Sequence, residues 1–159
     1  AEQLQLLKEK AKYYLFQGSP AEGGGISQLA LNALHDPVAI DIGPFRVQPV
    51  PVDHEKMPVW NVRIDDFAYV TDCSHIPDTS LPLLGDLDTL VLSALRYKSH
   101  PTHFSIDQAI GMTKQLKPQQ AFFTHFTHDV HHQTLLRELH QKIPEFPVKP
   151  AFDGLSLWL

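Results

Sequence analysis

The amino-acid sequence predicts an α/β fold, in one domain over residues 1–159. From Val38 to Ile64 the apolar residues follow a strand-like rather than a helical period. After Asp72, apolar runs of strand length alternate with segments of helical spacing, which is typical of βαβα organisation. A length of 159 residues with 43% hydrophobic residues is sufficient for one buried core.

The first part of the chain predicts a helix over Glu2–Phe16, because its apolar residues recur at the spacing of one helix face. The glycine-rich stretch Gly18–Gly25 ends this helix. We favour a flexible surface loop there over a phosphate-cradling loop, because no Lys-Ser/Thr pair follows the glycines. A short second helix is expected over Ile26–Leu34.

Strands follow, with a turn at Asp65–Asp66 that leads into a further strand at Phe67–Val70. Prolines in this part indicate edges or bulges, because proline cannot donate a backbone hydrogen bond. The three strands before the turn are expected at Val38–Ile40, Phe45–Val52 and Val59–Ile64.

The second half alternates between helices and strands. Ser105 is a predicted N-cap, and Pro118 ends the helix that Ser105 begins. A strand pair is expected around Asp153–Gly154, a strong turn signal. The other expected elements are a short helix or turn at Thr79–Leu84, strands at Leu90–Leu95 and Ala121–Thr124, and a helix at Asp129–Lys142.

Four apolar runs lead to a His or an Asp where they stop, which predicts a site at one edge of a sheet. These residues are His54, Asp72, His103 and His125. Neutral imidazoles together with a carboxylate suit zinc, manganese or iron. A Ser-His-Asp triad is poorly supported, because no serine lies in a nucleophile-elbow context.

The remaining candidates are weaker. Cys73 follows Asp72, and the adjacent acid should raise the pKa of its thiol, which favours a buried cysteine over a nucleophile. His75 and His100 are ambiguous, since they lie close to strand ends. The histidines interpreted as surface residues are His35, His131, His132 and His140.

Composition limits the partners and the location. A net charge of −5 gives no general attraction to nucleic acid or to an anionic membrane. One cysteine cannot form an intramolecular disulfide and fits a reducing, cytoplasmic compartment. No apolar run reaches the roughly 20 residues needed to cross a bilayer. Since the chain begins at Ala1, we expect a longer parent protein.

An ordered set of segments resembles the second half of a metallo-β-lactamase-fold hydrolase. The branch that contains the phosphoribosyl cyclic phosphodiesterases is the most similar one, and the tRNA 3′-end processing endonucleases are more distant. The resemblance extends over nearly the whole chain from about Tyr13. The segments that carry it are Val52–His54, Tyr69–Asp72, His100–Ala109, Phe123–Asp129 and Phe152–Leu157.

The resemblance implies a role for each site residue. In this family two divalent metal ions, zinc or manganese, lie about 3.5–4 Å apart. Asp72 would bridge both ions, with His54 as a ligand of the first and His125 as a ligand of the second. His103 would bind the phosphate or protonate the leaving oxygen. His128 would contribute to substrate binding, or only orient its neighbour.

The chain departs from the family at its hallmark. The motif His-x-His-x-Asp-His, which supplies two ligands to each metal, does not occur in this sequence, and neither does the first β-layer. Two protein ligands per ion fall short of the usual three. We therefore expect the C-terminal part of an αββα sandwich that lacks its N-terminal β-layer. Such a piece should be inactive alone and should associate with a second copy or with the missing half.

These inferences lead to three functional hypotheses. The parent protein would be a metal-dependent phosphodiesterase with a dinuclear site, acting on a small phosphate ester. Alternatively, the chain is a non-catalytic module that binds a metal or a partner, and whether it holds any metal by itself stays open. A tRNA-processing nuclease is the third hypothesis, which the net charge of −5 disfavours.

Overall fold

The computed structural model describes residues 2–10 and 33–158, and the chain forms two compact units, residues 1–36 and 37–159. In the first unit, helix α1 (Glu2–Lys10) confirms the start of the helix expected over Glu2–Phe16. The glycine-rich loop and most of the helix expected over Ile26–Leu34 lie outside the described residues. A single domain over the whole chain stays a prediction. Among the helices of the described ranges, none could cross a membrane.

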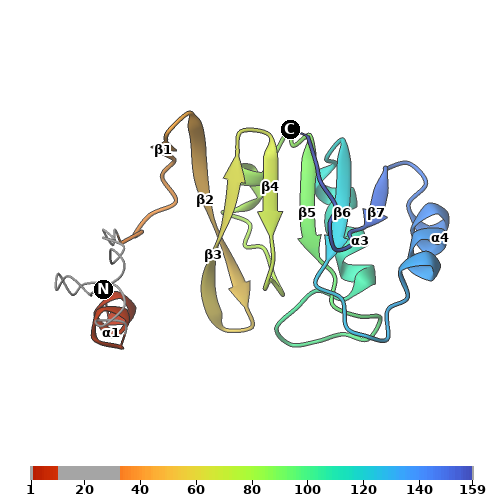
Figure 1. The fold of residues 1–159 in the computed structure, drawn as a ribbon, viewed down its shortest axis with the longest axis horizontal. Helices are drawn as coiled ribbons and strands as arrows, with labels where there is room; N and C mark the ends of the chain where they lie inside the picture. The colour runs from red at the N-terminus through yellow and green to blue at the C-terminus, as the bar shows by residue number, and fades with distance from the viewer. Residues whose placement is uncertain (1, 11–32, 159) are drawn as a thin grey trace, which may run out of the picture. The chain divides into compact units, whose positions relative to one another are not determined.

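The second unit is built on a mixed seven-stranded sheet whose strands follow one another in chain order (Figure 1). From β1 to β4 neighbouring strands are antiparallel, and from β4 to β7 they are parallel. The strands are β1 (Ile40–Ile42), β2 (Phe45–His54), β3 (Met57–Ile64), β4 (Phe67–Val70), β5 (Thr89–Ser93), β6 (Gln120–Thr124) and β7 (Val148–Pro150).

The antiparallel half follows the turn signals of the sequence. Asp65 adopts a left-handed φ of 51° in the tight connection that pairs Ile64 with Phe67. Strand β1 accompanies β2 only as far as Val47, whereas Pro49 and Pro51 pair with β3 alone. The prolines therefore occupy an edge, where a missing N–H removes no ladder hydrogen bond.

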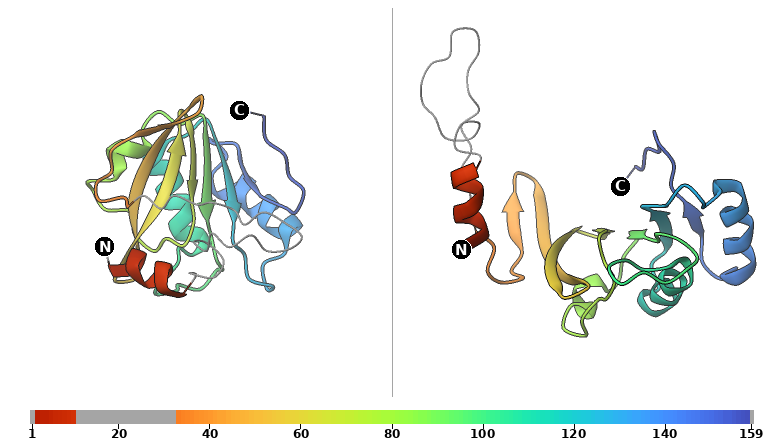
Figure 2. Two further views of the ribbon diagram at one scale, coloured as in Figure 1. Left: turned by 60° about the vertical axis from the view of Figure 1, so that its left-hand side comes forward. Right: turned by 90° about the horizontal axis from the view of Figure 1, so that it is seen from below.

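Two helical segments, η1 and α3, lie on one face of the sheet, and α4 lies beside the edge strand β7 (Figure 2). Ser105 caps α3 with a complete capping box: its side chain accepts from the backbone of Gln108, whose side chain accepts from the backbone N–H of Ser105. Lys117 ends α3 in a left-handed conformation, one residue before Pro118. The helical segments are η1 (Leu81–Leu84), α3 (Ile106–Leu116) and α4 (His132–Lys142).

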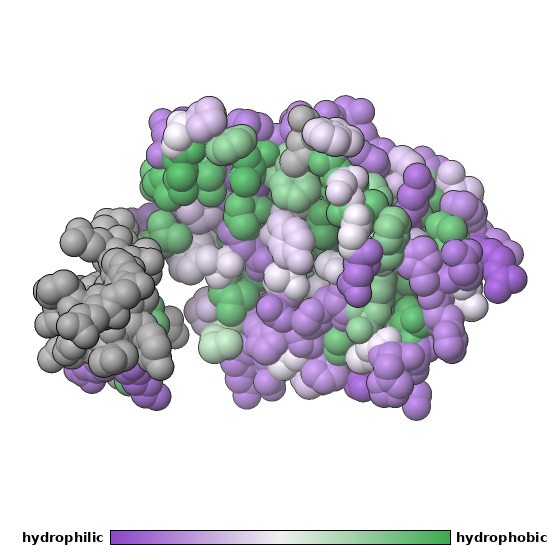
Figure 3. Space-filling model, viewed as in Figure 1, coloured by the Kyte–Doolittle hydropathy of each residue, from purple (hydrophilic) through white to green (hydrophobic). Residues whose placement is uncertain are grey.

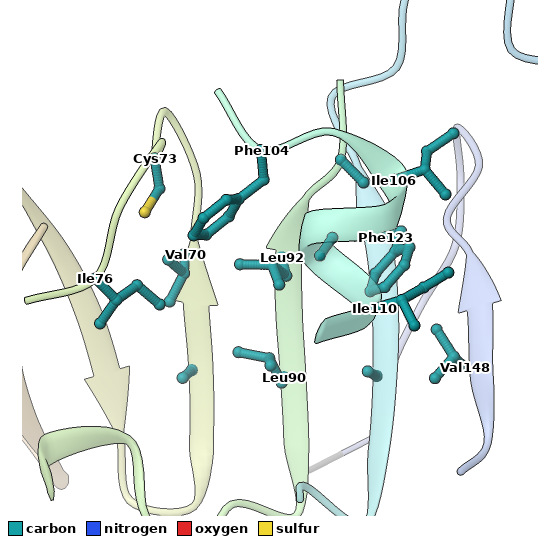
Figure 4. Packing of buried hydrophobic residues seen from close by; sticks show 14 of the residues in the cluster. Val70, Cys73, Ile76, Leu90, Leu92, Phe104, Ile106, Ile110, Phe123 and Val148 are labelled. Atoms are coloured by element: carbon teal, nitrogen blue, oxygen red, sulfur yellow. The ribbon is translucent and has the colours of Figure 1, made fainter. Parts of the chain in front are cut away.

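One hydrophobic core lies between this face and the helices. Figure 4 shows side chains of β4, β5 and β6 directed towards α3, with Phe123 among the largest that are completely buried. The same cluster contains Leu135 and Leu139 of α4 and Leu84 of η1. Since η1, α3 and α4 all contribute to it, the core holds the strand ends in fixed relative positions.

The opposite face of the sheet is apolar over β2 to β4, and no helix of residues 37–158 covers it there. Trp60 and Tyr69 are exposed on it, by 42% and 41%, and Tyr69 pairs with Val62 of the neighbouring strand. Figure 3 shows hydrophobic side chains gathered over the β1–β3 part of the molecule. Large apolar side chains exposed together on one sheet face are typical of a surface that contacts another polypeptide.

The predicted strand pair around Asp153–Gly154 is wrong. Only its first strand forms: β7 joins the free edge of β6 in parallel, and the backbone N–H of Ala151 extends this pairing to Phe123 O at 2.7 Å. The turn signal is satisfied locally, because Leu155 donates to Phe152 O at 3.0 Å, but residues 155–158 form no strand. The last helix also begins later than Asp129, at His132.

Replacing Phe123 with alanine should destabilise the fold strongly, because the change opens a cavity in the completely buried core. We expect the free energy of unfolding to fall by about 3–5 kcal/mol in denaturant titrations. Phe45→Ala is the matched control, since Phe45 is 54% exposed, and should cost roughly 1 kcal/mol or less. Equal losses for both variants would contradict this account of the core.

The thiol of Cys73 should be unreactive in the folded protein. Figure 4 shows its sulfur on the side of the core that holds Val70 and Ile76, and burial raises its pKa to about 12. The carboxylate that adds to this shift is Asp53 rather than the adjacent Asp72 that the sequence suggested. Iodoacetamide should label the denatured protein fully and the native protein negligibly, as measured by mass spectrometry; fast native labelling would contradict burial.

Candidate metal centre

The parallel half of the sheet brings several strand ends to one edge. Strands β4, β5 and β6 run in the same direction, so their carboxyl ends lie side by side. Asp72 follows β4 by two residues, and His125 comes directly after β6. His54 ends β2. Because β2 is antiparallel to β3, and β3 is antiparallel to β4, β2 runs in the same direction as β4 and ends at the same edge. The convergence expected at this edge is thus built into the strand directions.

Asp72 and His125 both have left-handed backbone conformations, with φ of 48° and 67°. Such values are uncommon outside glycine, although Asp and His tolerate them better than most residues. The chain turns sharply at these two positions, directly at the end of a buried strand. Left-handed residues of this kind cluster at functional sites, where the surrounding structure maintains them.

His103 reaches the site from the loop between β5 and α3. Two backbone hydrogen bonds fix its position: Phe104 N–H donates to Cys73 O at 2.8 Å, and Leu95 N–H donates to Phe104 O at 2.9 Å. The loop is therefore attached both to the segment that follows Asp72 and to the end of β5. This attachment places His103 between the other imidazoles.

The four side chains meet around Asp72. Its Oδ1 lies 3.5 Å from His125 Nε2 and 3.8 Å from His103 Nδ1. The His103 ring centroid is 4.9 Å from that of His54 and 4.8 Å from that of His125. His54, Asp72 and His103 each offer a donor atom such that these atoms lie within 4.8 Å of one another. These three could together hold a metal ion, and His125 lies next to them, beside Asp72.

The environment of His103 favours the neutral form of its imidazole. Burial, followed by the rings of His125 and His54, lowers its pKa, and the attraction of the Asp72 carboxylate opposes this without reversing it. Only 12% of its side chain is exposed, and its buried Nδ1 has no hydrogen-bond partner among the described residues. A neutral imidazole with an unsatisfied nitrogen, next to a carboxylate, fits a divalent metal ion.

Asn61 supports the site, and sequence analysis missed it. Its buried amide bonds both backbone groups of Thr71: Thr71 N–H donates to Oδ1 at 2.8 Å, and Nδ2 donates to Thr71 O at 3.1 Å. The amide thereby fixes the residue directly before Asp72. The available signal was a polar side chain inside the apolar strand Val59–Ile64.

A second network fixes the backbone next to His54. Asp53 Oδ2 lies 2.9 Å from His75 Nδ1, and the two residues also pair through their backbones. The Ser74 hydroxyl donates to Asp53 O at 3.0 Å. The ambiguous His75 therefore binds the strand that carries His54 rather than joining the metal centre itself.

The other histidines have different surroundings. His128 is exposed and takes part in none of the ring contacts of the cluster, so its substrate-binding role stays a prediction. His132 was expected at the surface, but it is half-buried and its Nε2 lies 3.0 Å from Pro150 O, which connects α4 to β7. His100 lies next to His103, with ring centroids 5.4 Å apart.

Comparison with known proteins gives the same architecture. A solved structure described as a new diphosphatase from the PhnP family is 34% identical, with a TM-score of 0.81; the match covers 98% of this chain and 55% of that one. The metallo-β-lactamase-fold protein YhfI from Bacillus subtilis is 22% identical, with a TM-score of 0.64. This match covers 76% of this chain and 52% of YhfI. The second similarity shows the fold alone.

An octanoyltransferase of Porphyromonas gingivalis is 27% identical over 145 residues, which is 91% of this chain and 28% of that protein. This chain therefore spans about half of the length of these two solved structures, and 28% of the length of the octanoyltransferase. A family model described as a beta-lactamase superfamily domain matches residues 4–126. With this match over most of its length, and with histidines gathered around one aspartate at the sheet edge, the chain belongs to the beta-lactamase superfamily and has the metallo-β-lactamase fold of its hydrolases.

Proposed function

We propose that this site belongs to a metal-dependent phosphodiesterase that hydrolyses a small phosphate ester. The convergence of three imidazoles on the Asp72 carboxylate carries the proposal. Neutral nitrogen donors beside one acidic oxygen are suited to zinc or manganese. The 34% identity with a diphosphatase of the PhnP family supports a phosphate-containing substrate, although this chain spans 55% of that protein.

Each residue has a part in the proposed chemistry. His54, Asp72 and His125 would hold two divalent ions, with Asp72 shared between them. The chemistry supplied by bound metal ions is the polarisation of a phosphoryl oxygen and the activation of water. His103 would donate a hydrogen bond from its neutral ring to a phosphate oxygen, because its lowered pKa disfavours a charged proton donor at neutral pH.

The position of His103 leaves a second role for the same ring. Its donor atom lies with those of His54 and Asp72, so the ring could serve as a third ligand. A metal site with three protein ligands is the usual composition of a catalytic zinc centre. The two roles differ in what happens to metal content when the ring is removed.

The non-catalytic alternative is a module that binds a metal or a partner. It is supported by the small number of candidate ligands. Two ions would each need about three protein ligands, and the site has four side chains. A tRNA-processing nuclease remains a weaker proposal, since the net charge of −5 lacks the basic surface that RNA binding uses.

The proposal extends to the surface opposite the helices and to the location of the protein. The exposed Trp60 and Tyr69 support coverage of this apolar face by another polypeptide, either the N-terminal β-layer of the family or a second copy. A layer placed there would lie next to the metal centre and could add ligands. A cytoplasmic location stays part of the proposal.

Asp72→Ala should abolish metal-dependent phosphodiesterase activity in the complete protein, because it removes the carboxylate that lies beside both His103 and His125. Turnover of a chromogenic phosphodiester with zinc or manganese added is the measurement. Asp78→Ala is the matched control, since Asp78 is exposed and should be silent. Undiminished turnover by Asp72→Ala would refute the central role of this carboxylate.

His103→Ala should retain the metal content of the wild-type protein but slow turnover by about 10²–10³-fold, as expected for the loss of a positioned donor. Elemental analysis and steady-state kinetics on the same preparation test both parts. His140→Ala, an exposed residue of α4, serves as the control. Loss of metal from His103→Ala would assign the ring as a ligand instead.

A further inference from the structure

We propose that His100 is a second substrate-binding residue, which presents a fixed Nε2–H to an anionic oxygen of the phosphate ester beside His103. This inference rests on the proposed function and adds a residue that the metal centre itself does not require. The supporting observations are the hydrogen bonds of its Nδ1, its distance from His103 and the attachment of its loop.

The hydrogen bonds at Nδ1 select one tautomer. The backbone N–H of Thr102 donates to His100 Nδ1 at 3.3 Å, and the Thr102 hydroxyl lies 3.0 Å from the same nitrogen. A backbone N–H can only donate, so Nδ1 must be the acceptor. The neutral ring then carries its proton on Nε2, which has no partner among the hydrogen bonds of the described residues.

The ring of His100 forms the next layer of the site. Its centroid is 5.4 Å from that of His103, and the two planes are inclined by 34°. His100 is half-buried, and it is not one of the three residues with metal-binding geometry. A substrate held at the metal centre would thus meet His103 first and could extend to His100.

The loop that carries His100 is anchored before substrate arrives. The Arg96 guanidinium donates to Lys98 O at 3.4 Å and to Ser99 O at 3.3 Å. Ile106 N–H donates to Arg96 O at 3.0 Å, which attaches the loop to the start of α3. Pro101 restricts the backbone between His100 and Thr102. A donor fixed in this way needs little reorganisation when charge develops on a phosphate oxygen.

The alternative is a purely structural histidine that only accepts the hydrogen bonds of its own turn. That role uses Nδ1 and leaves the Nε2 proton without consequence for binding. A substrate-binding role uses Nε2, so variants that replace one nitrogen or the other separate the two possibilities.

Two amide substitutions make the kinetic test. In His100→Gln the amide nitrogen reaches the position of Nε2, whereas in His100→Asn it reaches only that of Nδ1. We expect kcat/KM for a small phosphodiester to fall by about 10²-fold in His100→Asn and to be largely restored in His100→Gln, with metal content unchanged in both. His140→Asn is the surface control. Wild-type kinetics in His100→Asn, or equal losses in both variants, would overturn the proposal.

A second measurement does not depend on activity. In protein labelled with nitrogen-15 histidine and loaded with zinc, long-range proton–nitrogen spectra should show His100 as the Nε2–H tautomer. Titration with inorganic phosphate should shift its Nε2 signal. An Nδ1–H tautomer would overturn the role of His100. An Nε2 signal that does not shift at a saturating phosphate concentration would overturn it as well. Phosphate-induced shifts without any phosphodiesterase activity would sustain the inference and contradict the proposed function.

Discussion

The parallel alignment of β4, β5 and β6 is the constraint on which the site depends. Because these strands run in one direction, their ends lie at one edge of the sheet, and the left-handed turns at Asp72 and His125 both occur there. Because β2 is antiparallel to β3 and β3 is antiparallel to β4, β2 runs in the same direction as β4, and its end, with His54, lies at that edge too. Carboxyl-terminal edges of parallel strands are where α/β folds commonly bind ligands.

Hydrogen bonds around the strand ends keep the side chains of the candidate metal site close together. Asn61 fixes the residue before Asp72, Asp53 and His75 fix the backbone beside His54, and Phe104 attaches the loop of His103. Each link joins segments that are distant in sequence. Positions supported in this way can keep uncommon backbone angles and an unsatisfied buried nitrogen, which an isolated loop would relax.

The sequence predicted where the candidate site lies in the fold better than it predicted how its donor atoms are arranged. An apolar run that ends in a polar residue marks the end of a buried strand, so the convergence of His54, Asp72 and His125 could be expected. His103 was also expected at this edge, but its exact place among the donor atoms depends on hydrogen bonds of a loop, which the strand pattern does not predict. The missing second strand near Gly154 has a similar cause: its turn chemistry was recognised, but pairing depends on which sheet edge is free.

The number of donors in the cluster of described residues limits how many metal ions it could hold. His54, Asp72 and His103 could surround one divalent ion, with His125 adjoining through the shared carboxylate. Two ions would each require about three protein ligands, which four side chains cannot supply even if Asp72 is shared. Among the described residues, this cluster could therefore hold one divalent ion, but its donors are too few for two. Further donors for a dinuclear centre would have to come from polypeptide near the same sheet edge, which adjoins the apolar face of β2 to β4 that carries Trp60 and Tyr69.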